Sequence, residues 1–125
     1  MKSILQDEDG RSPTDRPFYT LYLGSPNREA FLPADRQRAL ALVNNRFPSF
    51  TTLNGEGYFE GEPLPTLIIQ IATKDRFSLS ELCQELCVEF DQEWIGVSDG
   101  DLYRSVRRIR RDTSKVPTLS VSLAS

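Results

Sequence analysis

A cluster of arginines is the feature of this sequence that most clearly could bind a charged ligand. Five arginines fall within eight residues, and Lys115 follows them: Arg104, Arg107, Arg108, Arg110 and Arg111. Guanidinium groups at this density can hold phosphates. Tyr103 alone adds an aromatic ring beside the run, so the aromatic interleaving typical of single-stranded nucleic-acid binding is thin.

Acidic residues ahead of the arginines offer them a different partner. A stripe of acids recurs at helical spacing, and two more acids follow it: Glu81, Glu85, Glu89, Asp91 and Glu93. Opposite charges in runs of this size can pair within one chain or between subunits. We favour such pairing over a phosphate or nucleic-acid site. The sequence leaves open whether the arginines pair with the stripe or bind an external anion.

Carboxylates and tyrosines near the middle of the chain are further candidates. The carboxylates alternate along a predicted strand and its turn: Glu56, Glu60 and Glu62. A pair of them could do acid–base work, but the same alternation is typical of a solvent-facing strand edge, which we favour. Three tyrosines could stack a ligand or serve as ordinary sheet residues: Tyr19, Tyr22 and Tyr58.

The sequence contains no histidine, which removes the usual general base near neutral pH and the commonest metal ligand. Cys83 and Cys87 lie four residues apart in a predicted helix, at a spacing that would strain a disulfide. A metal site needs about four ligands, and no third cysteine is present. We therefore expect free structural thiols, no metal, no cofactor and no catalytic residue.

Length and composition indicate one soluble domain. The chain has 125 residues, of which 38% are hydrophobic and 26% are charged, and its net charge is −3. Met1–Gln6 has no apolar stretch of the kind found in signal peptides, and no run is long enough to cross a membrane. We expect a cytoplasmic protein that does not bind membranes.

The element pattern is organised around Pro65–Thr73, the strongest apolar run, which predicts a central strand. Strands are also predicted at Phe18–Leu23, at about Phe50–Phe59 with a bulge, and from Trp94. A hairpin turn at Asn54-Gly55 is the alternative to the bulge. Helices are predicted over Pro33–Phe47 and from a capping box at Ser78–Glu81. Residues 101–111 could extend or re-enter the sheet.

The order strand, helix, strand, strand, helix, strand predicts an α+β fold, namely a ferredoxin-like βαββαβ antiparallel sheet with two helices on one face. We expect a flexible N-terminal arm at residues 1–16 and the folded domain at residues 17–111. Residues 112–125 then form a C-terminal tail, which either stays free or adds a strand.

Three short motifs resemble those of an uncharacterised bacterial family of small αβ proteins. They are Leu21-Tyr22-Leu23-Gly24, then Arg46-Phe47-Pro48, then Thr51–Tyr58 with the pattern T-x-L-x-G-x-G-Y. The resemblance covers about residues 18–97. It implies a ferredoxin-like fold and carries no activity, so no functional residue transfers from it.

These observations favour a non-enzymatic cytoplasmic binding protein that acts through a protein–protein interface, with a second copy of the chain or another protein as its partner. The residues expected to contact the partner are the five arginines of the run together with Tyr22 and Tyr58. Phosphate or nucleic-acid binding through Arg104–Arg111 is the alternative. A small carboxylate-dependent enzyme is the third hypothesis.

Overall fold

The computed structural model describes residues 16–26, 28–100, 102–110, 119–120 and 123–124. The elements are β1 (Phe18–Gly24), α1 (Pro33–Arg46), β2 (Thr51–Phe59), β3 (Glu62–Ala72), α2 (Arg76–Glu89), β4 (Trp94–Ser98) and β5 (Tyr103–Arg107). Two short strands, β6 (Leu119–Ser120) and β7 (Leu123–Ala124), pair with each other. All but the last residue of the predicted arm and most of the predicted tail lie outside the described residues.

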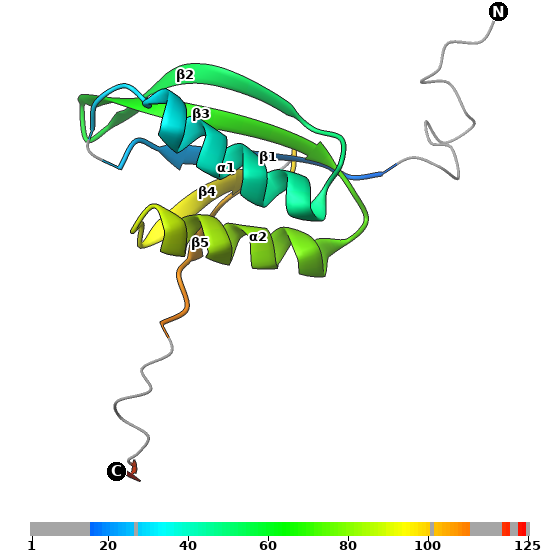
Figure 1. Cartoon of the computed structure of the whole chain (residues 1–125), viewed down its shortest axis with the longest axis vertical. Coiled ribbons are helices and arrows are strands. Elements are labelled where there is room, and N and C mark those ends of the chain that lie inside the picture. Colours follow the sequence, from blue (N-terminus) through cyan, green and yellow to red (C-terminus); the bar gives the residue numbers. More distant parts are fainter. Residues whose placement is uncertain (1–15, 27, 101, 111–118, 121–122, 125) are drawn as a thin grey trace, which may run out of the picture.

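The sheet has five strands in the order β2-β3-β1-β4-β5, and every neighbouring pair is antiparallel. The predicted central run lies in β3, which is paired with β2 on one side and β1 on the other. Figure 1 shows α1 and α2 side by side across one face of this sheet. The opposite face carries no helix of the described residues.

The predicted α+β class, with an antiparallel sheet and two helices, is confirmed. The predicted ferredoxin-like βαββαβ topology is wrong in its four-stranded form, because β5 is added beyond β4 as a fifth strand. The turn at Asp99 and Gly100 reverses the chain, with Gly100 at φ 99°. Val106 then packs against the core, which holds β5 in place.

Alternation along the strands gives the two faces of the sheet different characters. Leu21, Ile69 and Ile95 are buried against the helices, together with Val43 of α1 and Leu82 of α2. The intervening residues point away from the helices, since successive side chains of a strand lie on opposite faces. This second surface is called the open face below.

The strand β2 is continuous, which corrects the predicted bulge and excludes the alternative hairpin at Asn54-Gly55. Nine consecutive residues of β2 pair with β3. The reversal is instead a two-residue turn at Glu60-Gly61, with φ values of 51° and 82°. Positive φ at both central residues is the signature of a type I′ hairpin turn. Gly55 leaves room for Ile68, whose Cδ1 would lie 2.9 Å from a Cβ at that position.

The helix α2 begins before the predicted capping box. Its N-cap is Asp75, whose carboxylate accepts a hydrogen bond from the Ser78 N–H at 2.9 Å. Cys83 and Cys87 are buried free thiols in this helix, as predicted. Burial, and then the neighbouring Cys87, raises the pKa of Cys83 to about 12. Within the described residues, neither helix is both long and apolar enough to span a membrane.

Two acids of the stripe on α2, Glu85 and Glu89, pair with α1 rather than with the arginine run. Arg46 makes a bidentate contact with Glu85, with the Nη2–Oε2 distance at 2.7 Å. Arg38 Nε lies 3.0 Å from Glu89 Oε2. The contact with Arg46 lowers the pKa of Glu85 below its usual range. These pairs hold the two helices side by side. Glu85 and Glu89 are therefore not the partners of the arginine run.

Candidate functional site

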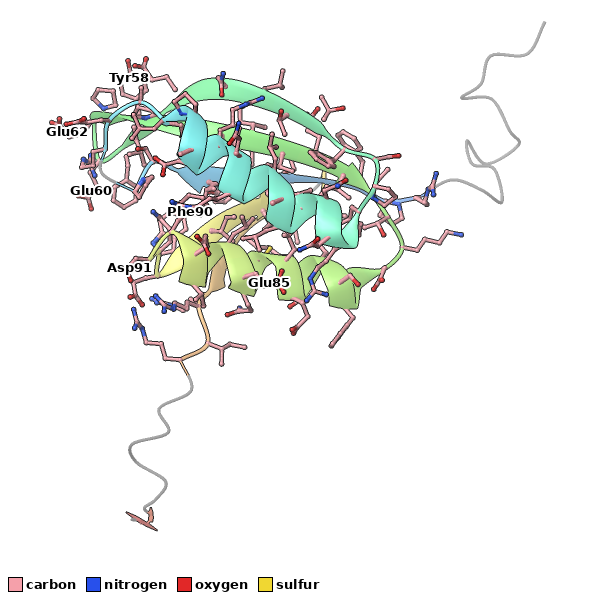
Figure 2. The ribbon with its side chains drawn as sticks, in the orientation of Figure 1. Tyr58, Glu60, Glu62, Glu85, Phe90 and Asp91 are labelled. Carbon is pink, nitrogen blue, oxygen red and sulfur yellow. The ribbon has the colours of Figure 1, made fainter. Side chains whose placement is uncertain are left out.

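An aromatic pocket lies at the end of the sheet where the β2–β3 hairpin meets the start of β4. The cavity has a volume of about 490 Å³. The loop after β1, the hairpin and residues 91–94 each contribute to its wall. Figure 2 labels Tyr58 and Asp91, which mark the two sides of this end of the molecule. We refer to this cavity as the aromatic pocket.

Two pairs of rings line the aromatic pocket. Tyr22 and Tyr103 have their centroids 5.7 Å apart, and Phe59 and Trp94 have theirs 5.9 Å apart. Both pairs are tilted by about 45°. Rings arranged in this way offer flat faces to a planar heterocycle and electron-rich surfaces to a cation. Tyr58 is a fifth ring in the wall.

The position of Tyr103 depends on Gly96, its close neighbour on β4. A Cβ at Gly96 would overlap the Tyr103 hydroxyl and lie 2.6 Å from Cζ. The absence of a side chain on β4 therefore lets the Tyr103 ring lie flat across the open face toward Tyr22. Burial, and then the neighbouring Tyr22, raises the pKa of Tyr103. Its hydroxyl keeps its proton at neutral pH and can donate a hydrogen bond.

We expect the substitution Gly96→Ala to weaken ligand binding in the aromatic pocket by about tenfold, the low end of what loss of one stacking ring costs. The added methyl group forces the Tyr103 ring out of its place. The fold should remain intact, because alanine can adopt the backbone conformation of Gly96 in β4. Calorimetric titration with adenine, a planar heterocycle, measures the affinity, and a thermal melt checks the fold.

Gly55→Ala is the matched control for Gly96→Ala. It adds the same methyl group on the same sheet, against the flexible end of Ile68 and outside the pocket wall. Equal losses of affinity in the two variants would show that Tyr103 does not shape the pocket.

Three charged residues line the aromatic pocket: Arg28, Asp91 and Glu93. Arg108 Nη1 lies 3.1 Å from Asp91 Oδ1, and Arg110 is bonded to the carboxylate of Glu93. No ion pair is recorded for Arg28 within the described part of the chain. The pocket thus presents aromatic faces together with two carboxylates and one guanidinium group.

Backbone strain is concentrated at the same end of the molecule. Among the described residues, positive φ outside glycine occurs at Arg28 (64°), Glu60 (51°) and Asp91 (52°). Asp91 follows α2 in a C-terminal capping motif, with Asp91 N–H donating to Val88 O and Gln92 N–H donating to Cys87 O. Glycine or asparagine adopts such a conformation more easily. Strained residues of this kind cluster at functional sites, which is a reason to consider this end of the molecule as a candidate.

A larger hollow of about 630 Å³ lies between the two helices and residues 108–110. Its charged side chains include Glu85, Glu89 and Arg108, each of which is already paired. None of the residues that line it carries an aromatic ring. The aromatic pocket is the better candidate for a binding site, because five aromatic rings line it.

The residues predicted to contact a partner are spread over several surfaces. Arg104 lies on the helix side of β5, in a small cavity with Arg76 and Asp99. Arg107 pairs in register with Trp94. Arg108 and Arg110 bind Asp91 and Glu93, and Arg111 lies outside the described residues. The run is therefore not a single surface of free guanidinium groups.

Tyr22 and Tyr58 both reach the aromatic pocket, although they come from different strands. The Tyr58 hydroxyl donates to Glu56 Oε1 at 3.1 Å, and this bond raises the pKa of Tyr58. Sequence reasoning missed the remaining pocket residues, most notably Phe59, Trp94 and Arg28. Among the described residues, no group of three or more acids and cysteines is placed to hold a metal ion.

Comparison with solved structures identifies a fold likeness. A phage SAM lyase in its apo state superposes with a TM-score of 0.56 and 15% sequence identity, covering 82% of this chain and 98% of the other. The phage SAM lyase in complex with S-methyl-5'-thioadenosine superposes with a TM-score of 0.50 and 16% identity over the same shares. No family model and no curated protein matches this sequence.

These findings correct two predictions. The fold likeness is to a phage enzyme, whereas no family model supports the bacterial family suggested by the short motifs. The predicted function, a non-enzymatic interaction protein with nucleic-acid binding as its alternative, is contradicted, because the similar structures belong to an enzyme. The pairing of Arg108 with Asp91 and of Arg110 with Glu93 inside the chain also removes two of the guanidinium groups on which the phosphate or nucleic-acid alternative rested.

Proposed function

We propose that this protein binds S-adenosylmethionine (SAM) in the aromatic pocket and cleaves it to S-methyl-5'-thioadenosine. The observation that carries the proposal is the pocket of paired rings in a fold that resembles a SAM lyase over 82% of this chain. Adenine is a flat heterocycle that stacks on such rings. The sulfonium group of SAM is a cation of the kind that aromatic faces and carboxylates attract.

The charged residues of the aromatic pocket suit the rest of the SAM molecule. Asp91 and Glu93 lie where an ammonium or sulfonium group would find a counter-charge. Arg28 supplies a guanidinium group, which binds a carboxylate through two parallel hydrogen bonds. A cavity of about 490 Å³ falls in the range of ordinary small-molecule sites. Each charged part of the ligand thus has a matching group in the wall.

The proposed reaction needs no general base. The carboxylate of SAM attacks its own γ-carbon, a carbon–oxygen bond forms, and the carbon–sulfur bond breaks with its electron pair passing to sulfur. The products are neutral S-methyl-5'-thioadenosine and homoserine lactone, and no proton is transferred. A sequence without histidine can support this step, because the protein must only fold the substrate onto itself. Elimination would instead require a general base, and the two carboxylates of the pocket wall, Asp91 and Glu93, are already paired with arginines.

We expect purified protein to convert SAM to S-methyl-5'-thioadenosine without added metal or cofactor, with mass spectrometry as the readout. Reaction in heavy-oxygen water separates the possible routes, since direct hydrolysis would label the hydroxyl group of homoserine. Intramolecular attack leaves that position unlabelled. A Trp94→Ala variant purified in the same way controls for contaminating enzymes. Equal conversion by both proteins, or no conversion by either, would overturn the proposal.

The predicted partner, a second copy of the chain or another protein, also stays a proposal. Its support is the open face, on which Leu53 and Phe59 remain exposed beside Trp94. Apolar surface of this kind is often covered by a partner. Solution mass at rising protein concentration would test whether the chain associates with itself.

A further inference from the structure

The segment after β5, residues 108–110, is fastened between α2 and the wall of the aromatic pocket. The amide of Gln84 holds it from one side: Nε2 donates to the carbonyl of Arg107 at 2.8 Å, and Oε1 accepts from the N–H of Ile109 at 2.7 Å. From the other side, the Arg108 N–H donates to the Glu93 carbonyl at 2.8 Å. The backbone of this segment is therefore fixed relative to the pocket.

Both arginines of the segment reach the acids of the aromatic pocket. Arg108 Nη1 lies 3.1 Å from Asp91 Oδ1, and the Arg108 side chain is 17% exposed. Arg110 contacts both carboxylate oxygens of Glu93, with Nε 3.3 Å from Oε1. The two carboxylates that line the pocket are thus the same two that the segment neutralises.

Other acids nearby do not compete for these arginines. Glu85 and Glu89 of α2 are paired with Arg46 and Arg38 of α1. Apart from Asp91 and Glu93, the charged residue of the pocket wall is Arg28, which is positive. The charge that a ligand meets in the pocket therefore depends on how far Arg108 and Arg110 cancel Asp91 and Glu93.

This balance matters for a reaction in which the substrate loses its sulfonium charge. An uncovered carboxylate attracts the cationic substrate more than the transition state, in which positive charge is already leaving sulfur. Such an interaction tightens binding and slows the chemical step, because only groups that favour the transition state over the ground state raise the rate. It has little effect on neutral S-methyl-5'-thioadenosine.

We propose that Arg108 and Arg110 are specificity-determining residues that screen the negative charges of Asp91 and Glu93, so that these carboxylates attract the cationic substrate without trapping it in the aromatic pocket. This inference rests on the proposed function, since it takes SAM as the ligand. The two arginines act through the carboxylates and touch neither the substrate nor the reacting atoms.

The test is the double variant Arg108→Gln/Arg110→Gln. We expect its affinity for SAM to rise about fivefold, the effect of one unit charge about 4 Å away in the dielectric of water. Its affinity for S-methyl-5'-thioadenosine should stay within twofold of the unaltered protein, roughly the scatter of such measurements. We expect kcat and KM to fall together, and the gain in affinity to shrink at high salt. Titration calorimetry with both ligands, together with steady-state kinetics, supplies the readouts.

The control is Arg104→Gln, which removes the same charge from the same part of the chain on the helix side of the sheet. It should leave the ratio of the two affinities unchanged. An unchanged ratio in the double variant as well, or weaker binding of both ligands, would overturn the inference while leaving the proposed function standing. If the unaltered protein binds neither ligand, the proposed function fails, and this inference fails with it.

Discussion

Trp94→Ala should lower the affinity for S-methyl-5'-thioadenosine by about 10- to 100-fold, the range that loss of one base-stacking ring produces. Trp94 is the one tryptophan in the sequence, and it contributes the largest ring of the aromatic pocket. Its partner Phe59 lies 5.9 Å away and would lose its own support. Cleavage of SAM should fall by at least the same factor, because the adenosyl group would no longer be held.

Two further variants locate the effect of Trp94→Ala. Trp94→Phe keeps a flat ring and should retain most of the affinity. Phe77→Ala removes a more exposed ring in the first turn of α2, outside the pocket wall, and should change nothing. Titration calorimetry measures each affinity. If Trp94→Ala binds as tightly as the unaltered protein, the ligand does not stack in this pocket.

Ile69→Ala should destabilise the fold by about 3 to 4 kcal/mol, as large-to-small changes in a closed core do. Ile69 is fully buried at the middle of β3, where it pairs with Leu21 of β1 and Thr52 of β2. A loss of this size is a large part of the roughly 5 to 15 kcal/mol that stabilises a domain of this kind. Urea denaturation followed by circular dichroism measures the change.

The neighbouring residue supplies the matched control for Ile69→Ala. Ile68 is the same residue type on the same strand, but it lies on the open face over Gly55 and is only partly buried. Ile68→Ala should cost about 1 kcal/mol, because part of its surface already meets water. Equal losses of stability in the two variants would show that side chains on the open face are buried as fully as those in the core.

Elements with strong local patterns could be predicted from the sequence. The β-branched run in β3 and the apolar stripe of α2 specify their structures within a few residues, and both appear as expected. The fifth strand could not be predicted in the same way, because Tyr103–Arg107 is a strand only through its pairing with β4. Edge strands depend on such non-local contacts more than on their own composition.

The aromatic pocket could not be predicted from sequence patterns either, because it also depends on contacts between distant residues. Tyr22 and Tyr103 come from opposite ends of the domain, and only the sheet order brings their rings together. The arginines were noticed for their density, yet two of them neutralise acids that stand close in sequence to Trp94. Charge density in a sequence does not tell whether the charge is free.

The absence of histidine led to the prediction that the protein has no catalytic residue, and this prediction was too broad. Its absence excludes the usual base-dependent hydrolases and many metal sites. It does not exclude a reaction in which the substrate carries both the nucleophile and the leaving group. In that case the site needs shape, flat surfaces and balanced charge, which tyrosine, tryptophan and paired acids supply.

The sheet order has a consequence for the way the protein is made. β1 lies at the centre of the sheet, with Leu21 paired to Ile69 of β3 and to Val97 of β4. The ribosome synthesises β1 before either partner, whereas the β2–β3 and β4–β5 hairpins can close as soon as each turn emerges. Closing distant pairs costs more chain entropy than closing hairpins. The nascent chain must therefore keep β1 unpaired until β3 has left the exit tunnel, and one edge of β1 stays open until β4 follows.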